Sequence, residues 1–369
     1  MQHKLLTTDS QLAELCQRAK ELETISLDTE FLWERTFYPK LGLIQLALSD
    51  EECYLLDPLE ILDLRPLGEL LANPFIIKIF HDAPQDLAIL ARATGATPCN
   101  IFDTRLAAGF AEMPATLSLG NLVKSLLEIE LDKSATRTNW LKRPLSNKQI
   151  LYAENDVRYL QAVRVILLSK IGSSKIQKWL DEELKDFDSP ASYDLFNPSK
   201  RYKRIKGYQR LDTAGLAVLI NLADWREEQA KEQDKPRGHI VGDAVLLEIA
   251  RSRPENTEAL QKSSISDKAL KKYGSALLKL ITESPESPET EPAKIIKKPT
   301  KQEKILLDNL HKYITLKSDL LGIDPHLIGN SNELKEMIHF AVKRAGLQNL
   351  RQGTGWRWEF LAEFFQKKL

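Results

Sequence analysis

The chain has 369 residues, of which 43% are hydrophobic and 28% are charged, which is typical of a soluble globular protein with two or three domains. No run free of charged residues exceeds eleven positions, too few to span a membrane. The N-terminal residues MQHKLLTTDS do not resemble a secretory signal, and the three separated cysteines predict neither a disulfide framework nor a zinc site. We therefore expect a cytoplasmic protein.

The net charge is zero, but the two halves of the chain differ in sign. Residues 1–200 contain 22 Lys and Arg against 29 Asp and Glu, whereas residues 201–369 contain 30 against 23. An acidic front half suits carboxylates gathered around metal ions, and a basic rear half suits contact with phosphate. Ordinary variation of surface charge explains the same numbers equally well.

The first 170 or so residues alternate between strand-like and helix-like segments. Apolar runs of strand length lie at Thr24–Leu27, Leu41–Leu48, Cys53–Leu56, Ile76–Phe80 and Asn100–Phe102. Apolar residues recur at helical spacing in Asp9–Leu22, Leu59–Ala72, Gln85–Thr94 and Leu117–Glu128. This alternation predicts an α/β domain whose strands are mostly parallel, with one hairpin turn at Glu51 and Glu52.

After about Ser146 the pattern is almost entirely helical. We expect a catalytic domain over residues 1–196, a basic linker over 197–210 and a helical domain over 211–284. A proline-rich linker follows over 285–300, because this stretch combines prolines with many charges. A second helical domain of similar size then occupies residues 301–369.

Acidic residues at three separate places suit one metal site. Asp28 and Glu30 are two apart at the predicted end of a buried strand, so both carboxylates point to the same side. Asp86 begins a predicted helix, and Tyr152 and Asp156 share one helix face at i, i+4 spacing. Hard oxygen ligands without a histidine or cysteine cluster favour Mg²⁺ or Mn²⁺. Each motif alone is weak, but the ordered set predicts two-metal phosphoryl chemistry.

The segments that carry these residues resemble a known family. They read ISLDTEFLWERTFYPKLGLIQLA, FHDAPQDLAIL and SATRTNWLKRPLSNKQILYAENDVRYL. They are similar to the three exonuclease motifs of the ribonuclease D family, in the DEDD subgroup with a tyrosine in the third motif. The resemblance implies a ribonuclease H-like α/β fold with a mixed sheet, and 3′-5′ hydrolysis that releases nucleoside 5′-monophosphates.

The same resemblance implies roles for the individual residues. Asp28, Glu30, Asp86 and Asp156 bind two divalent metal ions, with Asp28 bridging them. Tyr152 orients the attacking water, because a phenol that titrates near 10 is a poor base at neutral pH.

Candidate substrate-binding residues flank the motifs. Phe31 follows the first motif and can stack on the terminal base, although a core role is equally open. Basic side chains before the third motif can contact the RNA backbone. They are Arg137, Lys142, Arg143 and Lys148. We interpret Asp103 as a helix N-cap and His81 as a structural histidine.

The rear half resembles the helical HRDC domain shared by RecQ-type helicases and ribonuclease D. The matching segment contains Trp225, a core residue, and the basic residues Lys235 and Arg237, which we expect to contact phosphate. The last segment resembles a degenerate second copy of this domain. The whole resemblance implies a monomeric enzyme that trims RNA with a single-stranded 3′ end, above all transfer RNA precursors. A DNA 3′-5′ exonuclease and a non-catalytic RNA-binding protein are the alternatives.

Overall fold

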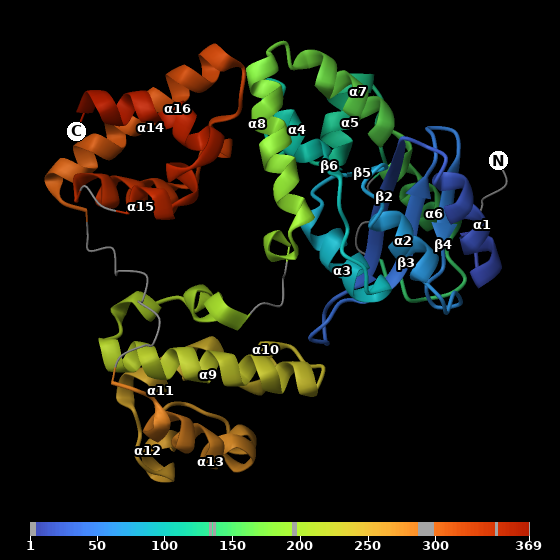
Figure 1. Cartoon of the computed structure of the whole chain (residues 1–369). Coiled ribbons are helices and arrows are strands. Elements are labelled where there is room, and N and C mark those ends of the chain that lie inside the picture. Colours follow the sequence, from blue (N-terminus) through green and yellow to red (C-terminus); the bar gives the residue numbers. More distant parts are fainter. Residues whose placement is uncertain are drawn as a thin grey trace. The chain divides into compact units, whose positions relative to one another are not determined.

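The structure is a computed structural model that describes residues 5–132, 135, 138–193, 198–286, 299–343 and 346–368. Its elements form two compact units (Figure 1). The first unit comprises Met1–Leu32, Leu41–Asp194 and Ile296–Leu369, and the second comprises Trp33–Lys40 and Leu195–Ile295. No helix in the described ranges is long and apolar enough to cross a membrane.

A six-stranded mixed sheet forms the centre of the first unit, with the strand order β1-β4-β3-β2-β5-β6. The strands are β1 (Leu5–Leu6), β2 (Thr24–Leu32), β3 (Lys40–Ala47), β4 (Cys53–Leu56), β5 (Ile77–Phe80) and β6 (Ile101–Asp103). Strand β5 pairs in parallel with β2 and with β6, whereas β3 and β4 are antiparallel. The mixed sheet confirms the predicted α/β fold class, and the β3–β4 hairpin confirms the turn predicted at Glu51 and Glu52.

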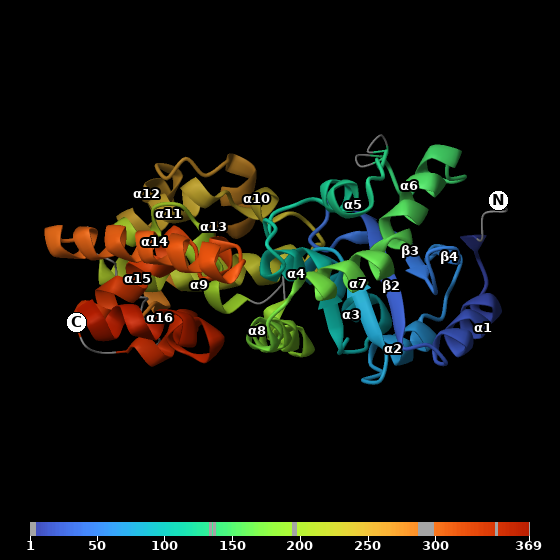
Figure 2. The ribbon, with the colours of Figure 1, turned by 90° about the horizontal axis from the view of Figure 1, so that it is seen from above.

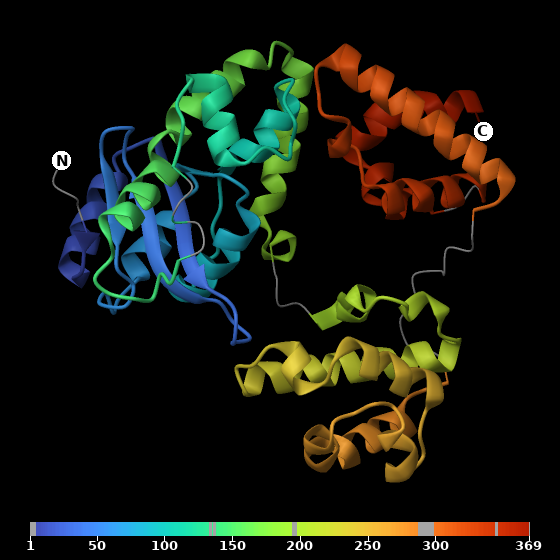
Figure 3. The same cartoon turned by 180° about the vertical axis from the view of Figure 1, so that it is seen from behind.

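Helices cover both faces of this sheet (Figure 2). One layer contains α1 (Asp9–Ala19), α2 (Arg65–Leu71) and α3 (Pro84–Thr94), which pack side by side. On the other face, α6 (Asn147–Arg158) and α7 (Leu160–Lys170) pack against β2. Figure 3 shows α6 crossing in front of the blue strands. The strand β2 therefore lies between α3 and α6, the two helices that carry the remaining motif residues.

The last three helices belong to the same compact unit as the sheet. They are α14 (Lys301–Leu321), α15 (Ser331–Val342) and α16 (Gly355–Lys368). Their buried apolar residues share one core with α4 (Thr104–Phe110), α5 (Leu119–Leu127), α7 and α8 (Ser174–Lys185). Trp356 stacks on Trp179 of α8 with the ring centres 5.3 Å apart. The helices α14, α15 and α16 thus share a hydrophobic core with the α/β domain.

In its described residues the second unit consists of helices and their connecting turns, together with the loop that connects β2 to β3. Its helices are α9 (Thr213–Glu232), α10 (Arg237–Ile240), α11 (Asp243–Ser252), α12 (Thr257–Gln261) and α13 (Asp267–Glu283), preceded by short 3-10 turns at Pro198–Arg204 and Tyr208–Arg210. Phe37 of the loop is buried in the core of this unit. The Asp234 carboxylate accepts hydrogen bonds from the backbone N–H groups of Phe37 (3.0 Å) and Tyr38 (3.3 Å).

Two element boundaries differ from the sequence-based expectation. Helix α2 begins at Arg65 rather than Leu59, with Pro66 in its first turn, where the fixed φ of proline suits a helix start. Strand β2 continues to Leu32, so Asp28 and Glu30 lie within the strand rather than at its end. The domain boundaries proposed from the sequence remain predictions.

Candidate active site

Two of the predicted carboxylates lie within β2. Asp28 and Glu30 are separated by one residue, and alternation along the strand places them on the same face. One carboxylate oxygen of each lies within 4.8 Å of the other and of an oxygen of Asp156. Alternation places Thr29 and Phe31 on the opposite face, so Phe31 projects away from this group of carboxylates.

Helix α6 supplies Tyr152 and Asp156 to the same place. A capping box starts this helix, because Ser146 and Gln149 each bind the backbone N–H of the other. Tyr152 hydrogen-bonds the Asp156 carboxylate one turn later. Its ring packs against the buried Trp140, with 6.0 Å between ring centres. The phenol is therefore fixed by apolar packing on one side and by Asp156 on the other.

Asp86 comes from α3, on the other side of β2. Pro84 occupies the first turn of this helix, and Asp86 is buried there, at 7% exposure. Its carboxylate accepts a hydrogen bond from the hydroxyl group of Thr29. Asp86 is not one of the three residues whose oxygens lie within 4.8 Å of one another. Strand β2 thus presents Asp28 and Glu30 toward α6, and Thr29 toward Asp86.

Burial raises the pKa of all four acidic groups, and repulsion between members of the group adds to the shifts of Asp28, Glu30 and Asp156. Burial raises the pKa of Glu30 to about 9, helped by the charges of Asp156 and Asp86. Burial likewise raises the pKa of Asp86 to about 7 and that of Asp156 to about 7, although hydrogen bonds from Thr29 and Tyr152 oppose these shifts. Burial, and then repulsion from Asp86, Asp156 and Glu30, raises the pKa of Asp28 well above its ordinary value.

This donor set fits a divalent metal ion. Asp28, Glu30 and Asp156 each offer one carboxylate oxygen to a common point, and carboxylates are the ligands that Mg²⁺ and Mn²⁺ prefer. Burial and the charges of neighbouring acids raise the pKa values of these four carboxyl groups. A bound cation would remove that mutual repulsion.

The basic residues that were predicted to contact RNA have different surroundings in the structure. Lys142 and Lys148 are exposed. Arg143 is engaged within the protein: it donates to both carboxylate oxygens of Asp57 (2.5 and 2.7 Å) and to the carbonyl oxygen of Gly42 (2.7 Å). It therefore ties the segment before α6 to the sheet. Arg137 lies outside the described residues.

Arg237 in the second unit is also engaged within the protein. Its guanidinium donates two hydrogen bonds, both of 2.5 Å, to the buried carboxylate of Glu227. It also lies 4.5 Å from the centre of the Phe37 ring. Arg237 is therefore only partly exposed, because a buried acid ten residues earlier on α9 holds it, and its contact with phosphate stays a prediction. Lys235 of the same segment lines a pocket of about 300 Å³ with Lys268 and Lys272.

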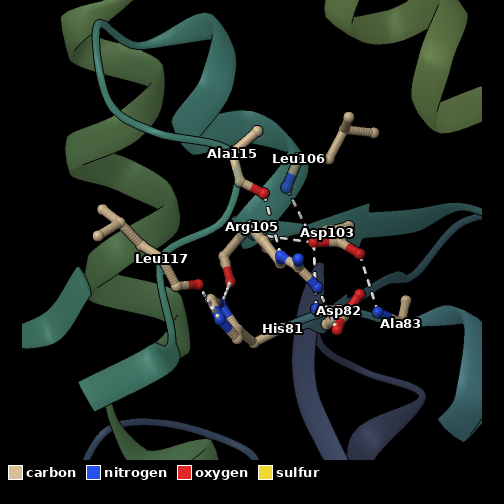
Figure 4. Close-up of polar contacts among 9 residues, drawn as sticks. His81, Asp82, Ala83, Asp103, Arg105, Leu106, Ala115 and Leu117 are labelled. Carbon is tan, nitrogen blue, oxygen red and sulfur yellow. Dashed lines mark hydrogen bonds and ion pairs between the residues drawn. The ribbon is translucent and has the colours of Figure 1, made fainter. Parts of the chain in front are cut away.

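Asp103 and His81, which the sequence predicted to be structural, form part of a larger polar network around the turn between β5 and α3 (Figure 4). Asp103 caps α4, as predicted, and also binds the turn between β5 and α3. His81 contacts the Thr104 hydroxyl through Nδ1 (2.9 Å) and the Leu117 carbonyl oxygen through Nε2 (3.1 Å). Burial lowers the pKa of His81, so a neutral ring donates from Nε2 to Leu117. His81 is thus structural, as the sequence predicted.

The predicted site omitted Thr29, the hydroxyl partner of Asp86. Its only signal in the sequence is its position between two acidic residues of the first motif.

Comparison with known proteins then shows the family. Residues 4–172 match the 3′-5′ exonuclease family and residues 215–281 match the HRDC domain. Ribonuclease D from Desulfotalea psychrophila is 52% identical over 367 residues, covering 99% of this chain and 98% of the relative. The chain belongs to the ribonuclease D family. Ribonuclease D from Escherichia coli is 31% identical and covers 98% of this chain and 97% of the relative.

The three-dimensional fold agrees with this assignment to the ribonuclease D family. The crystal structure of Escherichia coli ribonuclease D superposes with a TM-score of 0.87 at 30% identity, covering 100% of this chain and 99% of that one. The protein is accordingly an exoribonuclease with an HRDC domain. The catalytic core of RRP6 from Trypanosoma brucei shares the fold, with a TM-score of 0.57 at 22% identity.

Proposed function

We propose that this exoribonuclease hydrolyses the last phosphodiester of RNA with two divalent ions, Mg²⁺ or Mn²⁺, held by Asp28, Glu30, Asp86 and Asp156. The observation that carries the proposal is the meeting of three carboxylate oxygens within 4.8 Å. When bound, the ions lower the pKa of the attacking water and stabilise negative charge on the phosphate and the leaving 3′ oxygen. The product is a nucleoside 5′-monophosphate.

The surroundings of the individual residues support distinct roles. The charges of all three other acids raise the pKa of Asp28, which suits a carboxylate that would bind both ions. Asp86 is held by Thr29, so its oxygens keep one orientation toward β2. Tyr152 orients the attacking water through its phenol oxygen. Its bond to Asp156 and its packing on Trp140 fix that oxygen beside the carboxylates.

The substrate we propose is RNA with a single-stranded 3′ end, above all transfer RNA precursors. The structural relative from Escherichia coli is described as an exoribonuclease involved in structured RNA processing. Lys142 and Lys148 are exposed before and at the start of α6, where they can pair with backbone phosphates. A monomeric state and a cytoplasmic location remain predictions. In the described residues, Cys16, Cys53 and Cys99 are not joined by disulfide bonds.

One assay tests direction, product and metal together. RNA labelled at the 5′ end and carrying a single-stranded 3′ tail should yield a descending ladder with Mg²⁺ or Mn²⁺. Chelation should stop the reaction, and a 3′-terminal label should leave first as a mononucleotide. Early release of the 5′ label as a mononucleotide, or products from internal cuts, would contradict 3′-5′ removal.

A DNA strand of the same sequence addresses the alternative substrate, because carboxylates that act on the phosphodiester do not read the sugar. Equal rates on both strands would show that the sugar is not recognised and would contradict a preference for RNA. A transfer RNA precursor with a short 3′ extension, compared with the same precursor ending in a duplex, tests the requirement for a single-stranded end.

A further inference from the structure

The Asp103 carboxylate joins two turns that are distant in the sequence. It is almost fully buried, at 3% exposure. Its oxygens accept four backbone N–H groups, as Figure 4 shows in part: Asp82 (3.2 Å), Ala83 (2.8 Å), Arg105 (2.8 Å) and Leu106 (3.1 Å). The last two bonds cap α4, but the first two hold the turn between β5 and α3. A helix cap alone requires only the bonds to Arg105 and Leu106.

The turn held by Asp103 leads directly into the helix that carries Asp86. Ala83 is the N-cap of α3 and offers no side-chain acceptor, and Asp86 lies in the first turn of this helix. Asp82 has φ +66°, a left-handed conformation that an aspartate adopts at a cost. Hydrogen bonds from its own N–H to Asp103 and from Arg105 to its carboxylate hold it there.

A carboxylate and an amide at position 103 differ in the number of oxygen atoms that can accept hydrogen bonds. Both carboxylate oxygens of Asp103 are acceptors: Oδ1 binds Asp82, Arg105 and Leu106, while Oδ2 binds Ala83. An asparagine keeps one acceptor oxygen and places an NH₂ group against an N–H donor. The α4 cap can survive on that one oxygen, whereas the link to Ala83 is lost.

We propose that Asp103 is a positioning residue for Asp86. It acts through the backbone of Asp82 and Ala83 to fix the first turn of α3 against β2, where Thr29 binds the Asp86 carboxylate. This inference rests on the proposed function, in which Asp86 binds a metal ion. Partners that orient metal ligands typically change metal affinity or activity by about 10- to 100-fold when they are mutated.

The test measures Mn²⁺ binding by calorimetry on the full chain without RNA, and then kcat and KM on labelled RNA. D103N should raise the Kd for Mn²⁺ by about 10-fold or more and lower kcat. The KM for RNA should stay within about twofold, and excess Mn²⁺ should recover part of the rate. An unchanged Kd for Mn²⁺ would reduce Asp103 to a helix cap and overturn the inference.

Asp324 provides a matched control. It is also buried, at 7% exposure, and one oxygen accepts the N–H of Ala115 (2.6 Å) while the other accepts that of His326 (2.9 Å). It thus joins two chain segments through the same chemistry, and neither of these two bonds goes to the turn between β5 and α3. D324N should lower the melting temperature but leave the Kd for Mn²⁺ within about twofold. An equal loss of Mn²⁺ affinity in both variants would mean that general loosening, not positioning, is responsible.

Two further variants keep the outcomes distinct. D86N separates this inference from the proposed function. If D86N binds Mn²⁺ as tightly as the wild type, the assignment of Asp86 as a metal ligand fails. If D86N has a raised Kd for Mn²⁺ but D103N does not, only the positioning role of Asp103 is overturned. If D103N does not fold, R105Q removes the ion pair to Asp82 from the same turn. A rise in the Kd for Mn²⁺ in R105Q then supports the inference, and an unchanged Kd overturns it.

Discussion

Two clusters in the first unit place carboxyl groups in opposite environments. The Asp28 cluster, made of Asp28, Glu30, Asp86 and Asp156, contains acids that face other acids. The Glu183 cluster places one carboxylate of α8 between the guanidinium groups of Arg351 and Arg357. Arg351 donates to Glu183 at 2.6 Å, Arg357 binds both of its oxygens, and the Trp356 indole N–H donates at 2.8 Å.

The pKa directions follow from this difference. Burial raises the pKa of every acid in the Asp28 cluster. Burial also acts to raise the pKa of Glu183, but hydrogen bonds and charge from Arg357, and then the charge of Arg351, outweigh it, so its pKa lies below the ordinary value. Glu183 is 5% exposed, and Asp86 is 7% exposed. Burial alone therefore does not distinguish a site from a structural ion pair.

What distinguishes them is the source of the positive charge. The Glu183 cluster contains its own cations, and it fastens α16 to α8 within one core. Among the described residues, the charged groups that shift the pKa values of the Asp28 cluster are acids, which is the arrangement expected where the cation is an exchangeable metal ion. Mutations in the two clusters should therefore separate activity from stability.

The largest expected effect is that of D28N on turnover. Removing the carboxylate that faces the other three acids should lower kcat by several orders of magnitude, because a shared metal ligand is lost. The melting temperature of the metal-free protein should not fall, since the substitution also removes repulsion among buried acids. Rates on labelled RNA and thermal unfolding check both statements. Near-normal turnover would exclude Asp28 as a ligand.

The next effect is that of E183Q on stability. Breaking a buried ion pair leaves Arg357 without its counter-charge and should cost about 3–5 kcal/mol in the free energy of unfolding. In contrast, E69Q removes an exposed partner of Lys20 and should cost less than about 1 kcal/mol. Urea unfolding measures both values. At a temperature where E183Q is folded, kcat should match the wild type, and a large loss of kcat would show that the two clusters are coupled.

Local patterns in the sequence predicted the pairs within the Asp28 cluster, and the resemblance of the three motifs to one family joined these pairs and Asp86 into one site. Asp28 and Glu30 are two apart in a strand, Tyr152 and Asp156 are one helical turn apart, and these spacings alone determine which side chains share a face. Periodicity likewise predicted β3, β4, β5 and β6 and the helices α1, α3 and α5 to within about three residues, but it did not predict β1.

Partners distant in the sequence could not be predicted in this way. The Glu183–Arg357 pair joins residues from α8 and α16, and Arg143 is bound by Asp57 of the turn after β4. The sequence therefore predicted that Arg143 contacts RNA, whereas in the structure residues distant in the sequence bind its side chain. Composition likewise does not show that the last three helices share a core with the catalytic domain, because amphipathic helices look alike whether they cover their own core or another.

A smaller effect is expected for Tyr152, which contacts the Asp28 cluster without adding charge. Y152F removes the phenol oxygen but keeps the packing on Trp140. Loss of one transition-state hydrogen bond should lower kcat by about 100-fold. Mn²⁺ affinity, and RNA affinity measured with Ca²⁺, should stay near the wild-type values. The rising limb of the pH–rate profile should persist in Y152F. Its disappearance would indicate that the phenol is a general base. A wild-type rate would indicate that Tyr152 is only a core residue.

The smallest effect is the dependence of stability on pH, and it also separates the clusters. Raised pKa values, to about 9 for Glu30 and about 7 for Asp86 and Asp156, mean that the folded metal-free protein holds protons that the unfolded chain releases. This contribution to stability is complete below about pH 4 and is lost as pH rises through 7 toward 9. The melting temperature of the metal-free protein should therefore fall by a few degrees between pH 5.5 and 8.5.

Mn²⁺ should reverse that loss, because it binds the deprotonated carboxylates and competes with protons. The increase in melting temperature on adding Mn²⁺ should thus be larger at pH 8.5 than at pH 5.5. Glu183 has a lowered pKa, so its contribution is present at both pH values and E183Q should lose stability equally at each. D28N should show a weaker response to Mn²⁺ at pH 8.5. An equal response to Mn²⁺ at both pH values would mean that the Asp28 cluster does not exchange protons for the metal ion.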